Sequence, residues 1–239
     1  MTRAPALVAA SHGTSSPDGR AAVAALVDAV RRSARGLRVE DAFVDVQAPD
    51  VASVLDALGT AHESVVVPLL LSAGFHVHVD LGRAVRAGAG EPRLGASLGP
   101  DERLVDVLLA RLTEAGLRDD DRVVLAAAGS SDARAVEDCR VVGRRLAARL
   151  GRPVSVGFLS AARPSLADAV ARTRATHPVS RVVVSSYLLA PGYFHDLAAT
   201  AGATLTTVPI LRADAPPPAP LVELVLDRYE AAAALTRAA

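Results

Sequence analysis

The chain has 239 residues, a length that fits one large domain or two smaller ones, and its 51% of apolar residues excludes a chain that is disordered throughout. Its 26 basic and 26 acidic residues cancel, which argues against a general nucleic-acid or membrane-surface binder. All basic residues are arginine and the single cysteine is Cys139, which excludes a Schiff-base lysine, a P-loop lysine, an internal disulfide and a cysteine-rich zinc site.

Short apolar runs alternate with helical patterns through the first half of the chain. Strands are predicted over residues 5–10, 39–46, 64–71 and 93–97. Helices are predicted over residues 20–34, 49–61 and 101–115, with one more after the segment SAGFHVHVD at 72–80. Asp50 is expected to cap the second of these helices, and Asp80 the helix that follows the third strand. This alternation indicates a parallel sheet with right-handed crossovers.

The same order of elements is predicted again in the second half. Strands are predicted over residues 123–127, 154–159, 181–188 and 205–210. Helices are predicted over residues 133–150, from 164 onward, after the segment APGYFHD at 190–196, and over 220–234.

The two halves also resemble each other in sequence. The segment VAASHGTSS (8–16) aligns with VLAAAGSS (124–131), and FVDVQAP (43–49) aligns with FLSAARP (158–164). The apolar segment SVVVPLLLSAGF likewise aligns with RVVVSSYLLAPGY. We therefore predict an α/β fold of two similar flavodoxin-like lobes, each a parallel sheet flanked by helices, with the active cleft between them. The predicted boundary falls in the polar segment GLRDDD and gives lobes of residues 1–118 and 119–239.

Candidate functional residues lie in the loops that follow the first-half strands, where ligands of open parallel sheets bind. His12 follows the first strand, Asp45 closes the second, and His76 and His78 follow the third. If the first strand lies between the other two, these loops share one rim. Two imidazoles and a carboxylate then converge on one point. Such a set suits Fe²⁺, Co²⁺, Ni²⁺ or Zn²⁺, and three protein ligands leave open positions, as catalytic metal sites do.

The second half provides an internal comparison for these candidates. Ala128 aligns with His12, Ser160 aligns with Asp45, and Gly192 or Tyr193 aligns with His76, depending on how the segments slip. The apolar framework recurs in both halves and the candidate ligands do not. This difference favours a role of the candidates in function rather than in folding.

Three segments carry a resemblance to a known family. The segments LVAASHGTSSPDGRAAVAAL, FVDVQAP and VVVPLLLSAGFHVHVDL, together with the degenerate repeat, resemble the sirohydrochlorin chelatases over about residues 5–235. These class II tetrapyrrole chelatases insert Fe²⁺ for siroheme or Co²⁺ for cobalamin. The resemblance implies that the metal is a substrate, that the second substrate is a tetrapyrrole, and that no cofactor is permanently bound.

The resemblance also implies roles for individual residues. In the family, the histidines after the first and third strands hold the metal together with a glutamate that closes the second strand. These roles fall on His12, His76 and Asp45, where aspartate replaces the glutamate and its side chain is one methylene shorter. Insertion removes two pyrrole N–H protons, and imidazole can act as ligand or base near neutral pH. His12 and His76 are therefore the expected catalytic residues.

The tetrapyrrole carries eight carboxylates, and backbone N–H groups at helix starts are suited to bind anions. The substrate contacts expected at the two rims are Gly13, Thr14, Ser15, His78, Gly129, Ser130 and Tyr193. Arginines near the rim are expected to pair with the remaining carboxylates, but the sequence does not single them out.

Two other functions stay open. A non-catalytic carrier of metal or tetrapyrrole would use the same rim residues. A phosphoryl-handling hydrolase built on His12 is less favoured because Ser11 stands where histidine phosphatases have the phosphate-binding arginine. Structural roles are expected for the remaining histidines and the cysteine, namely His62, His177, His195 and Cys139.

The chain is expected to be cytoplasmic and soluble, because its start lacks a signal-peptide pattern and its longest apolar run, at 65–75, is too short to span a bilayer. A monomer is expected, since two lobes in one chain enclose the cleft that two subunits would otherwise form. Neither a nucleic-acid partner nor a membrane partner is expected.

Overall fold

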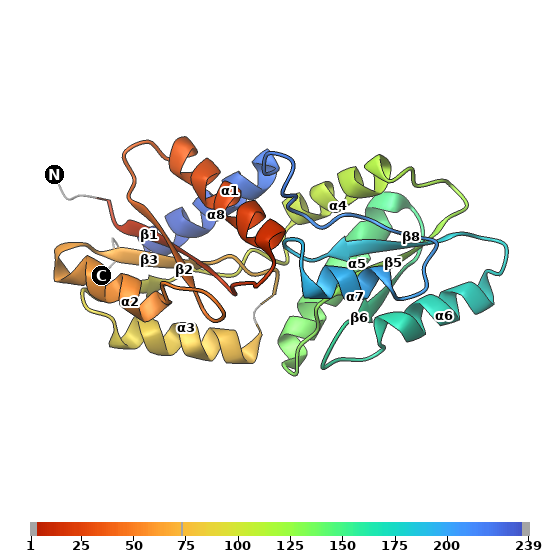
Figure 1. The fold of residues 1–239 in the computed structure, drawn as a ribbon, viewed down its shortest axis with the longest axis horizontal. Coiled ribbons are helices and arrows are strands. Elements are labelled where there is room, and N and C mark those ends of the chain that lie inside the picture. Colours follow the sequence, from red (N-terminus) through yellow and green to blue (C-terminus); the bar gives the residue numbers. More distant parts are fainter. Residues whose placement is uncertain (1–3, 73, 236–239) are drawn as a thin grey trace.

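The computed structural model describes residues 4–72 and 74–235 and contains two parallel four-stranded sheets flanked by helices (Figure 1). The first sheet has the order β2-β1-β3-β4 and consists of β1 (Ala6–Ser11), β2 (Val39–Phe43), β3 (Ser64–Pro68) and β4 (Arg93–Leu94). The second has the order β6-β5-β7-β8 and consists of β5 (Arg122–Ala127), β6 (Val154–Phe158), β7 (Val182–Tyr187) and β8 (Leu205–Thr206). The predicted fold class and the central position of the first strand are confirmed.

The helices connect the strands in the predicted order. They are α1 (Pro17–Ser33), α2 (Val51–Leu58), α3 (Phe75–Ala87), α4 (Glu102–Glu114), α5 (Ala133–Leu150), α6 (Leu166–Thr176), α7 (Tyr193–Ala199) and α8 (Ala219–Ala234), with the short 3-10 helix η1 (Gly59–Ala61) after α2. Asp50 caps α2 as predicted. Its Oδ1 accepts from the backbone N–H of Ser53 at 2.7 Å, a bond that lowers the pKa of Asp50.

Several predicted boundaries are wrong at the carboxyl ends of the strands. The strand β2 stops at Phe43 rather than at residue 46, because the chain turns at Val46, whose φ is 65°. The helix α3 begins at Phe75 with Gly74 as its N-cap, so Asp80 lies inside the helix and does not cap it. The helix α7 likewise begins at Tyr193, within the segment that was predicted as a loop.

The strands pair in the same way in both sheets, so equivalent positions of the two halves can be identified from the pairing. Ala10 lies opposite Pro68 in the first sheet, and Ala126 lies opposite Ser186 in the second. The central strands β1 and β5 are both buried along almost their whole length, as expected for strands that helices cover on both faces.

The last helix of each half packs on the sheet of the other half. The helix α8 contacts β3 and α1 of the first lobe, and α4 contacts β7 and α5 of the second (Figure 1). The two helices share a buried pattern, LVDVLLARL in α4 and LVELVLDRY in α8. The predicted division at residues 118–119 separates the two sheets, whereas in space α4 and α8 are exchanged across it.

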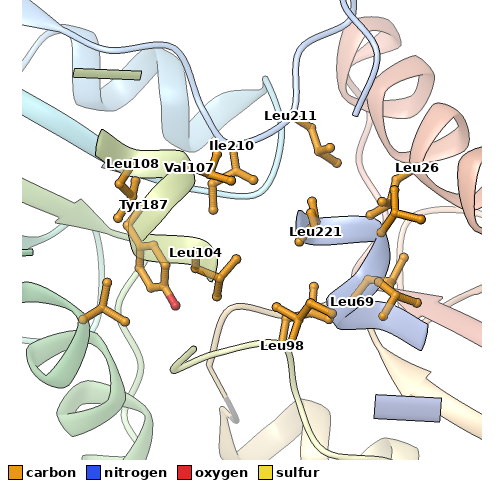
Figure 2. Close-up of a cluster of buried hydrophobic side chains, with 14 of the residues drawn as sticks. Leu26, Leu69, Leu98, Leu104, Val107, Leu108, Tyr187, Ile210, Leu211 and Leu221 are labelled. Carbon is orange, nitrogen blue, oxygen red and sulfur yellow. The ribbon is translucent and has the colours of Figure 1, made fainter. Parts of the chain in front are cut away.

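A continuous apolar core accompanies this exchange. Figure 2 shows Leu26 and Leu69 of the first lobe on one side, Leu108 of α4 and Tyr187 of the second lobe on the other, and Leu221 of α8 between them. Two further apolar clusters cover the outer faces of the sheets, one beneath α2 and α3 and one beneath α6 and α7. The two lobes are therefore joined by buried apolar surface as well as by the chain.

Candidate functional site

The candidate site begins where β1 ends at the edge of the first sheet. Ser11 is buried, and His12, the next residue, is exposed. Gly13 follows with a φ of 90°, and a Cβ placed on it would lie 2.0 Å from the backbone O of Asp45. Glycine is therefore required at position 13, because both the backbone conformation and the space exclude a side chain.

The loop after β2 lies directly against His12. The backbone N–H of Asp45 donates to the O of His12 at 3.0 Å, and that of Val44 donates to the O of Ser11 at 2.9 Å. The Asp45 side chain is exposed, and its Oδ1 accepts from the N–H of Val46 at 2.7 Å. The structure thus brings His12 and Asp45 together at one rim, although Asp45 lies two residues beyond β2 rather than in it.

His76 and His78 lie in the first turn of α3, on the same edge of the sheet because α3 follows β3. Their side chains are outside the part that the structure describes. Among the described side chains, no group of three or more His, Cys, Asp and Glu residues is placed to hold a metal ion. The ligand set of His12, Asp45 and His76 therefore stays a prediction.

The segment before α3 is held from the second lobe. The hydroxyl of Tyr187, at the end of β7, donates to the backbone O of Leu71 at 2.8 Å. Gly99 packs against both groups, and a Cβ on it would lie 2.3 Å from the Tyr187 hydroxyl. The sequence alignment of the two halves does not reveal this contact, because Tyr187 looks like an ordinary core residue there.

The second lobe repeats the backbone of the rim without its candidate ligands. Gly129 has a φ of 92°, a Cβ on it would lie 2.0 Å from the O of Ser160, and the N–H of Ser160 donates to the O of Ala128 at 2.9 Å. Ala128 and Ser160 thus occupy the places of His12 and Asp45. The difference in chemistry does not follow from a difference in fold.

The counterpart of His76 is Phe194, not Gly192 or Tyr193 as the sequence alignment suggested. Pro68 and Ser186 have equivalent places in the two sheets, and Gly74 and Gly192 are the N-caps of α3 and α7. The residues of each pair are 118 positions apart in the sequence. The same offset makes Phe194 the equivalent of His76.

The predicted anion site at the start of α1 is partly occupied by the protein itself. The N–H of Thr14 donates to Oε1 of Gln47 at 2.9 Å, and that of Ser16 donates to Oγ1 of Thr14 at 3.1 Å. Ser15 lies exposed between them. Gln47 is a positioning residue that the sequence analysis missed, and its place in the FVDVQAP segment was the available signal.

The contacts expected in the second lobe lie at its facing rim. Ser130 accepts from the N–H of Asp132 at the start of α5, at 3.0 Å, and so has a local structural role. Tyr193 is 74% exposed, and its ring lies 5.6 Å from that of Phe194, which is 37% exposed. His195 lies behind them with Nδ1 at 3.4 Å from Oγ of Ser186, and burial lowers its pKa.

The carboxyl ends of the two sheets face each other. A Cβ on Gly192, at the start of α7, would lie 3.4 Å from Oγ1 of Thr14, and one on Gly74 would lie 3.5 Å from Oγ of Ser130. The rim that carries His12 and Asp45 is therefore opposed by the rim that carries Phe194.

A family model described as CbiX matches residues 6–115 and 122–209 of the chain. The chain belongs to the CbiX family. The two matched stretches correspond to the two halves of the duplication. A curated sirohydrochlorin ferrochelatase from Priestia megaterium is 27% identical over 191 residues, which cover 76% of this chain and 71% of the relative.

Solved structures share the fold over nearly the whole chain. SirB from Bacillus subtilis with Fe³⁺ has a TM-score of 0.78 at 21% identity and covers 98% of both chains. The sirohydrochlorin chelatase SirB from Bacillus subtilis subspecies spizizenii, in complex with cobalt, has a TM-score of 0.73 at 19% identity and covers 98% of this chain and 97% of its own. CbiX, described as the terminal enzyme of siroheme biosynthesis in denitrifying bacteria, has a TM-score of 0.66 at 22% identity and covers 95% of this chain and 99% of its own.

Proposed function

We propose that this chain is a sirohydrochlorin chelatase that inserts Fe²⁺ or Co²⁺ into the macrocycle, as a step of siroheme or cobalamin biosynthesis. One observation carries the proposal. The first-lobe rim holds an exposed imidazole and an exposed carboxylate, His12 and Asp45, on adjoining loops, and the same backbone in the second lobe holds Ala128 and Ser160. Membership of the CbiX family supports it.

In this proposal His12, Asp45 and His76 take the divalent metal and leave positions for the pyrrole nitrogens. The metal is a substrate. Each insertion adds one M²⁺ to the ring and releases two protons from its two pyrrole N–H groups. A histidine that the ring nitrogens displace from the metal accepts one of these protons, which neutral imidazole does readily near neutral pH, and the other proton passes to solvent water.

The second lobe provides the surface for the macrocycle. Tyr193, Phe194 and Leu197 are all exposed and belong to the short helix α7. Residues three and four positions apart share a helix face, so Leu197 joins both aromatic side chains in one apolar patch. A flat tetrapyrrole has apolar faces that match such a patch, whereas exposed aromatic side chains are costly without a partner.

The carboxylates of the substrate are held at the rims. We assign them to Gly13, Thr14, Ser15, His78, Gly129 and Ser130, as the sequence suggests, and to three arginines near the starts of rim helices, Arg20, Arg134 and Arg163. Arg20 is fixed by donation from Nε to the O of Thr14 at 2.9 Å, and Arg134 and Arg163 have side chains that are 80% and 85% exposed.

Turnover tests the proposal against the carrier alternative. The purified apoprotein is mixed with sirohydrochlorin and an excess of Fe²⁺ or Co²⁺, and the absorbance of the macrocycle is followed. A chelatase converts many equivalents of macrocycle per protein, whereas a carrier stops at one. The phosphoryl-hydrolase alternative predicts hydrolysis of a phosphate ester that His12→Ala abolishes.

We also assign the chain to the cytoplasm as a monomer, with no permanently bound cofactor and without a nucleic-acid or membrane partner. None of the helices in the described residues has the length and apolar character that crossing a membrane requires.

A further inference from the structure

A groove on the outer edge of the second lobe is lined by side chains that have no role in the proposed function. Its lining comes from β5, the edge strand β6 and α6, and Figure 1 shows α6 on the side of the second lobe away from the first. Its volume is about 750 Å³, within the range of small-molecule sites. Arg122 begins β5 and Pro153 precedes β6, so this end of the groove lies at the amino ends of the strands, opposite the rim.

The lining of the groove carries basic side chains and no acidic ones. Arg122, Arg172 and His177 lie on its wall, over a floor that includes Val123 and Val156. No ion pair or side-chain hydrogen bond of Arg122 or Arg172 is present within residues 4–72 and 74–235. Within that part of the chain, two arginines of the groove thus have no carboxylate partner of their own, although the chain has as many acidic as basic residues.

Arg122 is the most informative of these residues. Its side chain is half-buried, and its Nε is inaccessible to water and has no hydrogen-bond partner in the described part of the chain. Other arginines with little exposure are satisfied. Arg111 donates to the backbone O of Pro209 and Ile210, and Arg228 donates to the O of Ser97 and Leu98. A buried charged donor without an acceptor is costly, and native proteins rarely keep one without a reason.

The first lobe again provides an internal comparison, here for residues that only the second lobe carries. The strand register places Ala6 at the position of Arg122, and the N-caps Asp50 and Ser165 place Ala57 at the position of Arg172. Both basic groups are absent from the first lobe, although the strand and helix that carry them are repeated. The two arginines are thus additions of the second lobe and not a requirement of the fold, whereas His177 has a counterpart in His62 at the same offset.

We infer that this groove is a second ligand site, which binds a small organic anion with an apolar body and a carboxylate or phosphate head at Arg122. The two terminal nitrogens of the guanidinium match either head with two parallel hydrogen bonds, whereas Nε itself is closed to a ligand. Arg172 adds positive charge, the His177 ring offers a further hydrogen-bonding group, and Val123, Val156 and Ala169 contact the apolar body. The site is independent of the proposed chelatase function, because its basic residues lie at the opposite end of the strands.

The test uses three ligands with one apolar body and different heads: phenyl phosphate, benzoate and neutral benzyl alcohol. Binding to the full chain is followed by backbone amide chemical shifts. We expect at least one anion to shift the amides of residues 122–123 and 172–177, with benzyl alcohol at least tenfold weaker. The comparison of phosphate with carboxylate identifies the preferred head. Arg122→Gln is expected to weaken binding of that anion about tenfold or more, whereas Arg174→Gln, which removes an exposed arginine from the same helix, changes it less than twofold.

Thermal unfolding separates a ligand site from a structural arginine. A guanidinium whose acceptor is supplied by a ligand does not stabilise the free protein, so Arg122→Gln should unfold at the wild-type temperature or above it. The anion should raise the melting temperature of the wild-type protein and not that of Arg122→Gln. The inference is overturned if neither anion shifts these amides, if the shifts lie only at the rim, if Arg174→Gln weakens binding as much as Arg122→Gln does, or if Arg122→Gln lowers the melting temperature of the free protein.

Discussion

His12 and Asp45 lie in loops whose backbone is nearly the same in both lobes. The fold therefore does not require these two side chains, because Ala128 and Ser160 occupy the same places in the second lobe. His12 is exposed, so its loss should leave the structure intact. The position of these two residues at one rim was predictable from the sequence, because each lies at or just beyond the end of a predicted strand in a recognisable motif. The contact of Gln47 was missed, since it is a hydrogen bond to Thr14 across a loop, and only the place of Gln47 in the FVDVQAP segment pointed to it.

His12→Ala should abolish insertion and leave the melting temperature within about 1 °C of wild type, since an exposed loop side chain contributes little packing. Ala128→Ser, at the equivalent place in the second lobe, is the control and should insert metal at the wild-type rate. Initial rates with saturating sirohydrochlorin and Co²⁺ measure both variants. A His12→Ala protein that keeps most of its turnover removes His12 from the mechanism.

Asp45→Asn should weaken Co²⁺ binding by about tenfold or more, since in the proposed site the metal would lose a negatively charged oxygen ligand. The asparagine oxygen can still accept from the N–H of Val46, so the loop should keep its shape. Asp45→Glu should be tolerated, because it restores the family's residue. Ser160→Ala is the matched control in the second lobe. Unchanged affinity in Asp45→Asn would show that the carboxylate serves the turn alone.

At the scale of elements, the sequence predicts the order and type of the strands and main helices, since apolar runs indicate the strands and Ser or Asp N-caps indicate where most helices begin. The starts of α3 and α7 escaped prediction because their N-caps are Gly74 and Gly192, and glycine is a weak signal there. That error also hid the equivalence of His76 and Phe194.

The turn between α4 and β5 is fixed by a buried ion pair. The Asp121 carboxylate is fully buried and accepts from Nε and Nη2 of Arg181 at 2.8 and 2.6 Å and from the N–H of Arg118 at 2.8 Å. The bond from Arg181 lowers the pKa of Asp121. The polar GLRDDD segment predicted as a boundary is therefore an anchored turn.

Asp121→Asn should lower the free energy of unfolding by about 2 kcal/mol at pH 7, because it leaves Arg181 without its bidentate acceptor. A lowered pKa means that this stabilisation is complete above the ordinary aspartate value of about 3.9 and is lost as the pH falls below it. Urea unfolding at pH 7 and pH 3 measures the difference, which should shrink at the lower pH. Glu137→Gln, in an exposed ion pair, is the control with no change. A constant difference at both pH values would contradict the account.

The whole molecule is two copies of one unit that exchange their last helices. Arg111 of α4 donates to the O of Ile210 in the second half, and Arg228 of α8 donates to the O of Leu98 in the first. The sequence showed the duplication but not the exchange, because LVDVLLARL and LVELVLDRY have nearly the same apolar pattern, which does not indicate which sheet each helix covers. Which sheet each one covers depends on the path of the chain between the lobes.

This exchange predicts how a fragment behaves. Residues 1–118 include α4 but lack α8, so the first sheet would expose the apolar face around Leu26 and Leu69. The fragment should therefore fold only as a dimer in which two copies exchange α4. Sedimentation and urea unfolding over a range of concentrations measure this, and a stable, concentration-independent monomer of residues 1–118 would contradict it.

The central claim is that two imidazoles of the first lobe hold the metal, and Co²⁺ titration of the apoprotein across pH tests it most directly. Protons compete with metal for neutral imidazole, which titrates at about pH 6.5 when free, so affinity should fall steeply between about pH 7 and pH 5, with a limiting slope of two in log affinity per pH unit. In His12→Ala the residual affinity should be lower and its slope should approach one. A site of carboxylates alone would keep its metal down to about pH 4 to 5. A wild-type affinity that stays flat from pH 7 to pH 5 would contradict the two-histidine site and the insertion mechanism that depends on it.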